Sequence, residues 1–364
     1  MLIKNQYKTA FLLEPGSSYN IDCQKIDLEI NYDDKLDLLR LDHNAGYDKV
    51  LPAELFTYHI EPEEHLSDLA NYTTKILEDN DSPKSISCFS YKDNPLALSI
   101  LETSRANFEV QKSNQLVEKR LSELKNRELK LISEGVILCR HALEHSDDPL
   151  GDLTYLINIL GKNSYLLIEI PDSSYQLRNN CIAMLWECHR SYFTQISIEK
   201  LIGLAKGEIV FQRRYSYECE DVIAILIKKK VSSDFSVIQS SDKSLINSYI
   251  DHLTQVHSNK NNLKNDACTI LFGAGHSGLT YMYIHNYSDC IDYIVDDAPD
   301  KSNKLTPCSK HRIISSSSLA KLCKGKNLKI ISSLKPNKTL KIINSLSEKG
   351  LHISSFSSIF EEQV

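Results

Sequence analysis

A short segment near the middle of the chain brings together side chains that can move protons. Residues 187–192, ECHRSY, contain the carboxylate of Glu187, the imidazole of His189 and the phenol of Tyr192. Histidine titrates near neutral pH, and burial or a neighbouring charge tunes its pKa, so this segment could supply a base that removes a proton from a substrate. The alternative is a surface helix whose aromatic residues pack against the core. The spacing alone leaves both interpretations open.

A second group of titratable residues follows an apolar run. Residues 135–139, GVILC, have the composition of a buried strand, and the loop after them carries His141, Glu144 and His145. Ligands of open α/β sheets bind beyond the carboxyl ends of parallel strands, where this loop would lie. We expect at least one of these residues to act in binding or catalysis. His145 could serve as a base, or it could only form a hydrogen bond within the loop.

A glycine-rich turn with a phosphate-binding pattern stands in the last third of the chain. Gly273, Gly275 and Gly278 follow the apolar run ACTILF, 267–272, and precede a stretch compatible with a helix. In this arrangement backbone amides approach a phosphate at the positive end of the helix. Asp296 ends the next apolar run, where a carboxylate can accept hydrogen bonds from ribose hydroxyls. The same pattern also occurs in α/β folds that bind no dinucleotide.

Short apolar runs alternate with amphipathic stretches through the centre of the chain. Continuous apolar strands that alternate with helices are typical of a parallel sheet covered on both faces. We therefore predict a doubly wound α/β domain over residues 61–232. Its strands are expected at ISCFS, FEV, LKLI, GVILC and YLLIEI, its helices near 62–79, 95–104, 114–126 and 149–160, and its final antiparallel hairpin at 208–217 and 221–230.

Two further parts complete the predicted organisation. Residues 1–60 alternate polar and apolar positions in short runs, which indicates a small β-rich N-terminal lobe. After a polar stretch, a helix over 245–256 and a second series of apolar runs predict a smaller Rossmann-like domain over residues 245–364. The fold class that we expect is therefore α/β, with two αβ units and a small lobe.

Composition and charge exclude several classes of protein. The net charge of −6 provides no basic field that would attract nucleic acid. Apolar runs are too short for a membrane-spanning helix, and the N-terminus lacks the pattern of a secretory signal. The ten cysteines include no CxxC pair, so we expect no zinc tetrad and no other metal site. We expect a cytoplasmic protein that binds a small molecule, and neither nucleic acid nor membrane.

Several of these segments, in this order, resemble the sugar-nucleotide C-methyltransferase family. GVILCRHALEHSDDP is similar to the family's LEH loop, YLLIEIPD to the strand after it, and HRSYFTQISIEKLI to its Tyr-x-Glu-His-x-Ser-Tyr-Phe motif. ILFGAGHSGLTYMYI and DYIVDDAPDKSNKLTP resemble the opening of the family's C-terminal domain. The resemblance covers most of the chain from Leu51 onward. It implies a class I methyltransferase-like sheet, a second Rossmann-like domain and a small N-terminal lobe.

The resemblance also implies a reaction, in which S-adenosyl-L-methionine (SAM) methylates a carbon next to a ketone of a nucleotide-linked sugar. In the family a base removes the proton beside the carbonyl, and the enolate attacks the methyl group of SAM. By position, His189 matches the catalytic histidine, His145 the histidine of the LEH loop and Tyr192 the motif tyrosine, and Glu187 completes the expected catalytic set. The residues expected at the cofactor are Ser90, Asp93, Gln111 and His141, and those expected at the nucleotide or substrate are Gly273, Gly275, Gly278 and Asp296.

The chain departs from the family at several positions. Residues 87–95, SCFSYKDNP, contain no glycine where class I methyltransferases have a glycine-rich turn. Gln111 stands where an acidic residue would hold the ribose, and Trp186 and Cys188 replace a tyrosine and a glutamate of the catalytic motif. The N-terminal lobe has one cysteine, Cys23, so a four-cysteine zinc site cannot form there.

Three functions are compatible with these observations. The first is an active SAM-dependent C-methyltransferase with His189 as its base. The second is a homologue that has lost the cofactor and binds a nucleotide or sugar nucleotide as a non-catalytic or regulatory protein. The third is a nicotinamide-dependent oxidoreductase built around the glycine turn and Asp296, which leaves the other motif matches unused.

Overall fold

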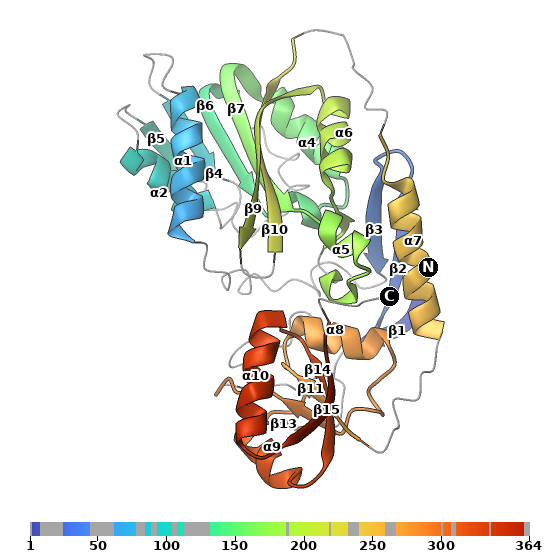
Figure 1. The fold of residues 1–364 in the computed structure, drawn as a ribbon. Helices are drawn as coiled ribbons and strands as arrows, with labels where there is room; N and C mark the ends of the chain where they lie inside the picture. Colours follow the sequence, from blue (N-terminus) through green and yellow to red (C-terminus); the bar gives the residue numbers. More distant parts are fainter. Residues whose placement is uncertain are drawn as a thin grey trace.

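Three β-sheets organise the chain in a computed structural model (Figure 1). They are formed by the N-terminal, central and C-terminal parts of the sequence, and the C-terminal sheet packs below the other two in the view of Figure 1. The structure describes residues 2–7, 25–43, 62–77, 84–88, 93–103, 108–112, 132–186, 189–217, 220–231, 240–258, 267–299, 301–306, 311–334 and 336–359.

The central sheet has six strands in the order β5-β4-β6-β7-β10-β9. Strands β4, β5, β6 and β7 are parallel, whereas β10 runs antiparallel to both of its neighbours. This parallel sheet with an antiparallel finish confirms the predicted α/β, class I methyltransferase-like fold. The strands are β4 (Lys84–Cys88), β5 (Phe108–Lys112), β6 (Ile132–Arg140), β7 (Leu160–Pro171), β9 (Gly207–Tyr217) and β10 (Glu220–Lys229).

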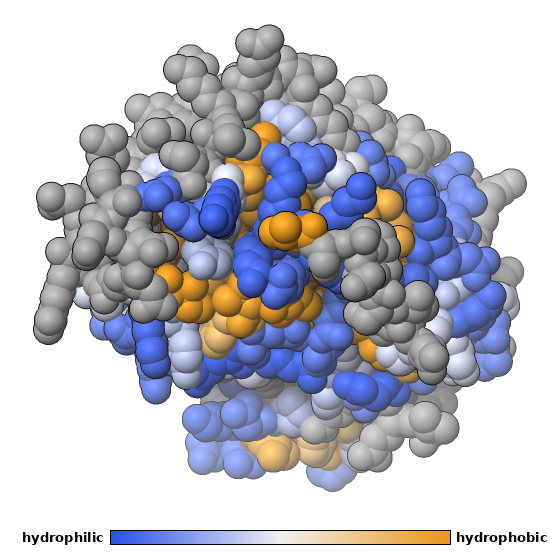
Figure 2. Space-filling model, turned by 90° about the horizontal axis from the view of Figure 1, so that it is seen from above, coloured by the Kyte–Doolittle hydropathy of each residue, from blue (hydrophilic) through white to orange (hydrophobic). Residues whose placement is uncertain are grey.

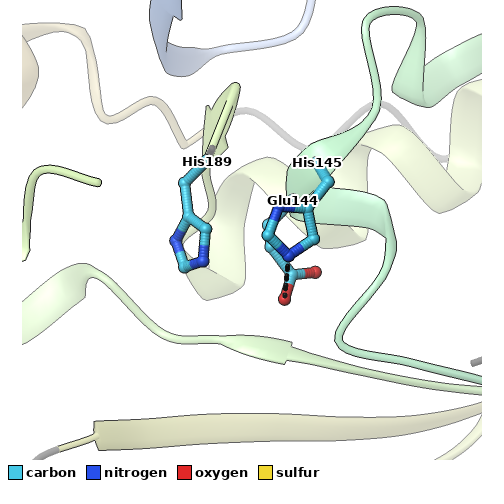
Figure 3. Close-up of side chains that lie close together, drawn as sticks. All are labelled: Glu144, His145 and His189. Atoms are coloured by element: carbon cyan, nitrogen blue, oxygen red, sulfur yellow. Dashed lines mark ion pairs between the residues drawn. The ribbon is translucent and has the colours of Figure 1, made fainter. Parts of the chain in front are cut away.

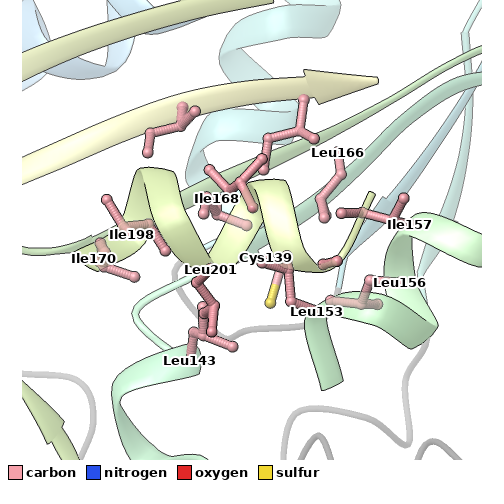
Figure 4. Close-up of a cluster of buried hydrophobic side chains, with 14 of the residues drawn as sticks. Cys139, Leu143, Leu153, Leu156, Ile157, Leu166, Ile168, Ile170, Ile198 and Leu201 are labelled. Carbon is pink, nitrogen blue, oxygen red and sulfur yellow. The ribbon is translucent and has the colours of Figure 1, made fainter. Parts of the chain in front are cut away.

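Helices cover both faces of the central sheet, as its apolar strands require. Leu166 and Ile168 face a cluster formed with helices α4 and α6 (Figure 4), whereas Val136 and Leu167 face the opposite cluster with α1 and α2. Each such fully buried aliphatic side chain stabilises the fold by about 1.5–3 kcal/mol. The helices are α1 (Glu63–Leu77), α2 (Asp93–Thr103), α4 (Pro149–Asn158) and α6 (Gln195–Leu204).

Capping residues fix where α4 and α6 begin. The side chain of Asp148 accepts a hydrogen bond from the backbone N–H of Gly151 at 2.9 Å, and Pro149 occupies the first turn of α4. Thr194 and Ser197 form a capping box at the start of α6. The caps orient the loops that precede both helices, and these loops carry the candidate histidines.

The N-terminal sheet has four antiparallel strands in the order β1-β2-β3-β8. Its fourth strand comes from the middle of the chain, because β8 pairs with β3 through Tyr192 with Leu39 and Ser191 with Arg40. Helix α7 packs on this sheet, and its Tyr249 is buried in the shared apolar cluster. The elements are β1 (Leu2–Tyr7), β2 (Lys25–Asp33), β3 (Leu38–His43), β8 (Ser191–Tyr192) and α7 (Lys243–Ser258).

The C-terminal sheet has five parallel strands in the order β13-β12-β11-β14-β15. The order runs outward from β11 in both directions, as in five of the six strands of the Rossmann order 3-2-1-4-5-6, and confirms the smaller Rossmann-like unit. The elements are β11 (Cys268–Phe272), α8 (His276–Ile284), β12 (Tyr293–Val295), β13 (Ile313–Ile314), α9 (Ser316–Leu322), β14 (Asn327–Ser332), α10 (Pro336–Glu348) and β15 (His352–Ser358).

The surface mixes hydrophilic and hydrophobic residues. Seen from above, the coloured residues are mostly hydrophilic, and hydrophobic ones gather in a band near the centre of the view (Figure 2). Within the ranges that the structure describes, no helix is long and apolar enough to cross a membrane. The helix expected near 114–126 lies outside those ranges.

Candidate functional site

Two imidazoles and a carboxylate meet beyond the carboxyl end of β6 (Figure 3). Glu144 and His145 lie in the short 3-10 helix η4 (Leu143–His145), and His189 lies just before β8. The rings of His145 and His189 are 4.8 Å apart between centroids and meet edge to face, and Nε2 of His145 is 3.9 Å from Oε1 of Glu144. The structure thus brings together two of the residues expected in catalysis, His145 and His189.

Backbone hydrogen bonds hold His189 in this place. The N–H of His189 donates to the carbonyl of Trp186 at 3.0 Å, and the N–H of Arg190 donates to the carbonyl of Glu144 at 2.7 Å. On the other side, the N–H of Leu41 in β3 donates to the carbonyl of Arg190 at 3.1 Å. The segment is therefore fixed between η4 and the N-terminal sheet.

Trp186 connects the histidines to the C-terminal sheet. Its ring stacks on His276 at 3.9 Å and on His189 at 5.9 Å, measured between centroids. His276 is the first residue of α8, and its Nε2 lies 2.9 Å from the carbonyl of Leu185. The candidate site consequently lies where the central and C-terminal sheets meet, and Trp186 has a stacking role in the position where the resembled family has tyrosine.

The surroundings of His189 keep its imidazole uncharged. Burial lowers its pKa most, the nearby His145 lowers it further, and Glu144 acts in the opposite direction; together they bring the pKa of His189 to about 3. At neutral pH this side chain therefore has a nitrogen lone pair that can accept a proton.

Glu144 is ionised in the same surroundings. Burial raises its pKa, but a hydrogen bond with His141 and the electrostatic interactions with His145, His141 and His189 lower it more, so the pKa of Glu144 is about 2. Its Oε2 is buried and has no hydrogen-bond partner among the residues that the structure describes.

Tyr192 supports the loop of Trp186. Its hydroxyl accepts a hydrogen bond from the N–H of Trp186 at 2.8 Å and donates one to the carbonyl of the same residue at 3.1 Å. Its ring lies 6.1 Å from that of His189 between centroids. The phenol expected in catalysis is thus engaged with the backbone, and Glu187, also expected there, lies outside the described residues.

The positions expected at the cofactor are only partly described. Asp93 starts α2, is fully buried, and accepts a hydrogen bond from the backbone N–H of Arg140 at 3.0 Å. Gln111 lies within β5, and Ser90 lies outside the described residues. The carboxylate of Asp93 therefore joins the start of α2 to the end of β6.

His141 belongs to a buried ion cluster that the sequence analysis missed. Glu169 in β7 is fully buried, and its carboxylate lies 3.0 Å from Nη2 of Arg140, 2.9 Å from Nε2 of His141 and 2.9 Å from Nε2 of His65. Burial raises the pKa of Glu169, but the guanidinium of Arg140 and the hydrogen bonds with His141 and His65 together lower it more and hold it well below its usual range. The available signal was the acidic residue inside the apolar run YLLIEI, because a fully buried glutamate is almost always paired.

The described residues do not form a cradle for SAM. The chain has no glycine between Gly46 and Gly135, so no backbone in β4, α2 or β5 has the room that glycine gives a ligand. Gly135 is required by its close contact with β4, because an added Cβ would lie only 2.1 Å from the carbonyl oxygen of Ser85. At the carboxyl ends of β6 and β7 the interior is filled by the paired side chains of Arg140 and Glu169. The described residues therefore provide no glycine-lined turn for SAM, and residues 89–92 of the expected cofactor loop lie outside them.

Two of the three glycines in the C-terminal turn are required by packing. Gly273 has φ +99°, and a Cβ there would lie 1.9 Å from Oγ of Ser333. A Cβ on Gly278 would lie 2.5 Å from the carbonyl oxygen of Gly273. Gly275 differs, because an added Cβ would meet nothing within 4 Å, and this residue precedes α8 without a side-chain cap. Because Gly275 has no side chain, this residue does not cover the positive N-terminal end of α8.

The carboxylate of Asp296 is hydrogen-bonded to residues of the glycine turn and of the loop after β12. Its carboxylate accepts hydrogen bonds from the N–H of Ala274 at 2.9 Å and of Ala298 at 3.0 Å, and from Nζ of Lys301 at 2.8 Å. These contacts give the carboxylate a structural role in holding β12 to the glycine turn. A role toward ribose stays a prediction, and the nicotinamide-dependent alternative, which depends on this residue, gains no support.

Comparison with known proteins finds similar solved structures and no matching family. No protein-family model and no curated protein matches the chain. Among solved structures, the chain is similar to 1,6-didemethyltoxoflavin-N1-methyltransferase of Burkholderia thailandensis with bound S-adenosylhomocysteine, at 14% identity and TM-score 0.33 over 46% of this chain and 80% of that one. It is also similar to a SAM-dependent methyltransferase of Clostridium acetobutylicum, at 11% identity and TM-score 0.29 over 50% of this chain and 96% of that one. Because the sequence identities and TM-scores are this low, the activities in the names of these two proteins are not assigned to this chain.

Proposed function

We propose that the chain binds a nucleotide-linked sugar or a related keto compound beside His189, and that His189 removes the proton next to the carbonyl group. The observation that supports this is the uncharged imidazole of His189, held between His145 and Trp186 beside the ionised Glu144. The proton moves from carbon to an imidazole nitrogen, the electron pair of the C–H bond forms the carbon–carbon double bond of the enolate, and the π pair of the carbonyl group moves to its oxygen. The carboxylate then stabilises the imidazolium.

An anionic substrate suits the charges around His189. Burial lowers its pKa most, and His145, His141 and His276 lower it further, so a diphosphate bound nearby would offset the effect of these histidines and raise the pKa. The uncovered N-terminus of α8 at Gly275 offers backbone N–H groups and the positive end of a helix, both of which favour a phosphate. These features support a substrate that is linked to a nucleotide.

SAM-dependent C-methylation is the fuller form of this proposal, because an enolate is the nucleophile that such a reaction needs and the central sheet is methyltransferase-like. A second candidate is a protein that binds a nucleotide-linked sugar but has lost methyl transfer, with a non-catalytic or regulatory role. The ion cluster of Arg140 and Glu169 at the cofactor end of the sheet favours this candidate. Calorimetric titration with SAM and S-adenosylhomocysteine distinguishes the two.

Proton exchange tests the base without reference to SAM. The full chain would be incubated in D2O with a keto-sugar nucleotide, and loss of the proton next to the carbonyl would be followed by proton NMR. We expect exchange with the wild-type protein and a rate at least about 100-fold lower with His189→Gln, because a general base contributes at least that factor. The matched control is His352→Gln, a histidine exposed in β15, which should exchange at the wild-type rate.

The outcomes separate the two candidates. Binding of dTDP, GDP or CDP by calorimetry without proton exchange would support the non-catalytic candidate. Equal exchange in the wild type and in His189→Gln would remove His189 as the base. Absence of both binding and exchange would contradict both candidates.

A further inference from the structure

We infer that Glu144, His145 and His189 form a binding site for a divalent transition metal ion of the zinc class. One ligand atom from each residue lies within 4.8 Å of the other two, and Figure 3 shows the two imidazoles side by side with the carboxylate below that of His145. Two imidazoles and a carboxylate are donors that such ions prefer, and three protein ligands leave a fourth position for water or a substrate oxygen. The inference does not rest on the proposed function.

The ligand atoms are close to the spacing that one ion requires. A tetrahedral zinc ion about 2.1 Å from each ligand places neighbouring ligand atoms about 3.4 Å apart. Nε2 of His145 and Oε1 of Glu144 are 3.9 Å apart, and no pair in the group exceeds 4.8 Å. The planes of the two imidazoles are 78° apart, so both rings can turn toward one ion without stacking on each other. Small side-chain rotations close the remaining gaps.

The carboxylate of Glu144 provides an independent observation. The residue is 1% exposed, and its Oε2 is buried without a hydrogen-bond partner among the described residues. A buried polar atom left unsatisfied costs about 1–3 kcal/mol, and more when the group is charged. Bidentate coordination, with Oε2 bound to the cation as well as Oε1, would remove that cost. An ionised carboxylate oxygen of this kind, beside two imidazoles, is suited to metal ligation.

Outer contacts already orient the carboxylate. Nδ1 of His141 lies 3.6 Å from Oε1 of Glu144, and its other ring nitrogen is bound to Glu169 at 2.9 Å. The carbonyl of Glu144 also accepts the hydrogen bond from the N–H of Arg190. Metal sites commonly depend on such outer contacts to fix their ligands. These contacts therefore hold Glu144 in position before an ion binds.

No pair of cysteines marks this site in the sequence, because its ligands come from two separate segments, residues 144–145 in η4 and residue 189 before β8. An ion bound here would occupy a lone pair of His189. Metal binding and proton removal would consequently exclude each other at this residue, and the ion would act as an inhibitor of the proposed base.

Cobalt provides a direct optical test, because Co²⁺ in a site of low coordination number absorbs visible light. The chelator-treated full chain would be titrated with Co²⁺, and bound Co²⁺ would then be displaced by Zn²⁺. We expect one ion per chain. We also expect a loss of affinity of more than about 100-fold in each of Glu144→Gln, His145→Gln and His189→Gln, because mutation of a residue that only hydrogen-bonds a metal ligand already costs 10- to 100-fold. The control His352→Gln should bind as the wild type does.

Circular dichroism of each variant shows whether it is folded, and one folded ligand variant is enough for the comparison. Absence of visible Co²⁺ absorption in the wild type would overturn the inference. So would absorption that is unchanged in the folded ligand variants, since the ion would then bind elsewhere. The absorption does not depend on a keto substrate, so failure of proton exchange and failure of metal binding are separate results.

Discussion

Replacement of Glu169 by glutamine tests the buried ion cluster at the end of β7. The wild-type carboxylate is fully buried within 3.0 Å of the guanidinium of Arg140 and of the imidazoles of His65 and His141. Glu169→Gln keeps the shape of the side chain but removes its charge and one accepting oxygen. Arg140, which is also fully buried, would then have lost the carboxylate that pairs with it.

The expected loss of stability is large. Removing one partner of a buried ion pair costs about 3–5 kcal/mol, because the remaining charge stays out of water without compensation. The amide NH2 of glutamine would also face an N–H group of Arg140, His141 or His65. Two donors that face each other leave a buried group without an acceptor, which costs about 1–3 kcal/mol. The two costs overlap, so we expect the free energy of unfolding to fall by about 3–5 kcal/mol.

Urea unfolding followed by circular dichroism at pH 7 measures this loss. The matched control is Glu208→Gln, which removes an ion pair with Lys228 at 3.0 Å whose side chains are about half exposed. Exposed pairs contribute about 0–1 kcal/mol, so the control should change little. A loss for Glu169→Gln no larger than that of the control would refute the reasoning.

The dependence on pH has a definite sign. Burial raises the pKa of Glu169, but Arg140, His141 and His65 together lower it more, so the folded value lies well below the unfolded value of about 4.3. Such a carboxylate contributes its full stability above the unfolded pKa and loses it as the pH falls toward the folded pKa. The difference between wild type and Glu169→Gln should therefore be constant above about pH 5 and become smaller below about pH 4. A difference that grew in acid would contradict the assignment.

Two further predictions concern the glycine turn and the tryptophan. Gly278→Ala places a Cβ 2.5 Å from the carbonyl oxygen of Gly273 and should cost about 1–3 kcal/mol in thermal unfolding, whereas Gly275→Ala meets nothing within 4 Å and should cost much less. Equal losses in the two variants would count against the packing argument. Tyr192→Phe removes the hydroxyl that binds the N–H and the carbonyl of Trp186. Because Trp186 is the chain's one tryptophan, we expect the fluorescence emission of the protein to move to longer wavelength. Unchanged emission would show that the hydroxyl does not hold this loop.

Local patterns predicted most of the central and C-terminal architecture. The hairpin expected at 208–217 and 221–230 is β9 and β10, and the helix expected over 245–256 is α7, Lys243–Ser258. These elements were accessible because their apolar periodicity lies within a few consecutive turns or residues. His145 and His189 were expected in one catalytic set because they lie in segments that resemble one family's catalytic loops, and the structure brings their rings together.

Contacts between distant parts of the chain could not be predicted in this way. His65 and Glu169 are 104 residues apart, and the residues around either one do not predict that it contacts the other. Tyr192 was expected in catalysis or in a surface helix, but it pairs in β8 with Leu39 and holds the backbone of Trp186. In each case the partner is set by tertiary packing rather than by spacing along the sequence.

The pairing of β3 with β8 has a consequence for the order of folding during synthesis. Strand β3 ends at His43, and its neighbour begins only at Ser191. At roughly 5–20 residues per second, the ribosome needs on the order of 10–30 s to make the intervening segment. During that time the edge of β3 has unpaired backbone groups, which is a hazard for aggregation. The lobe that leaves the ribosome first is thus completed late, and a chaperone that shields this edge would be expected to improve the yield of folded protein.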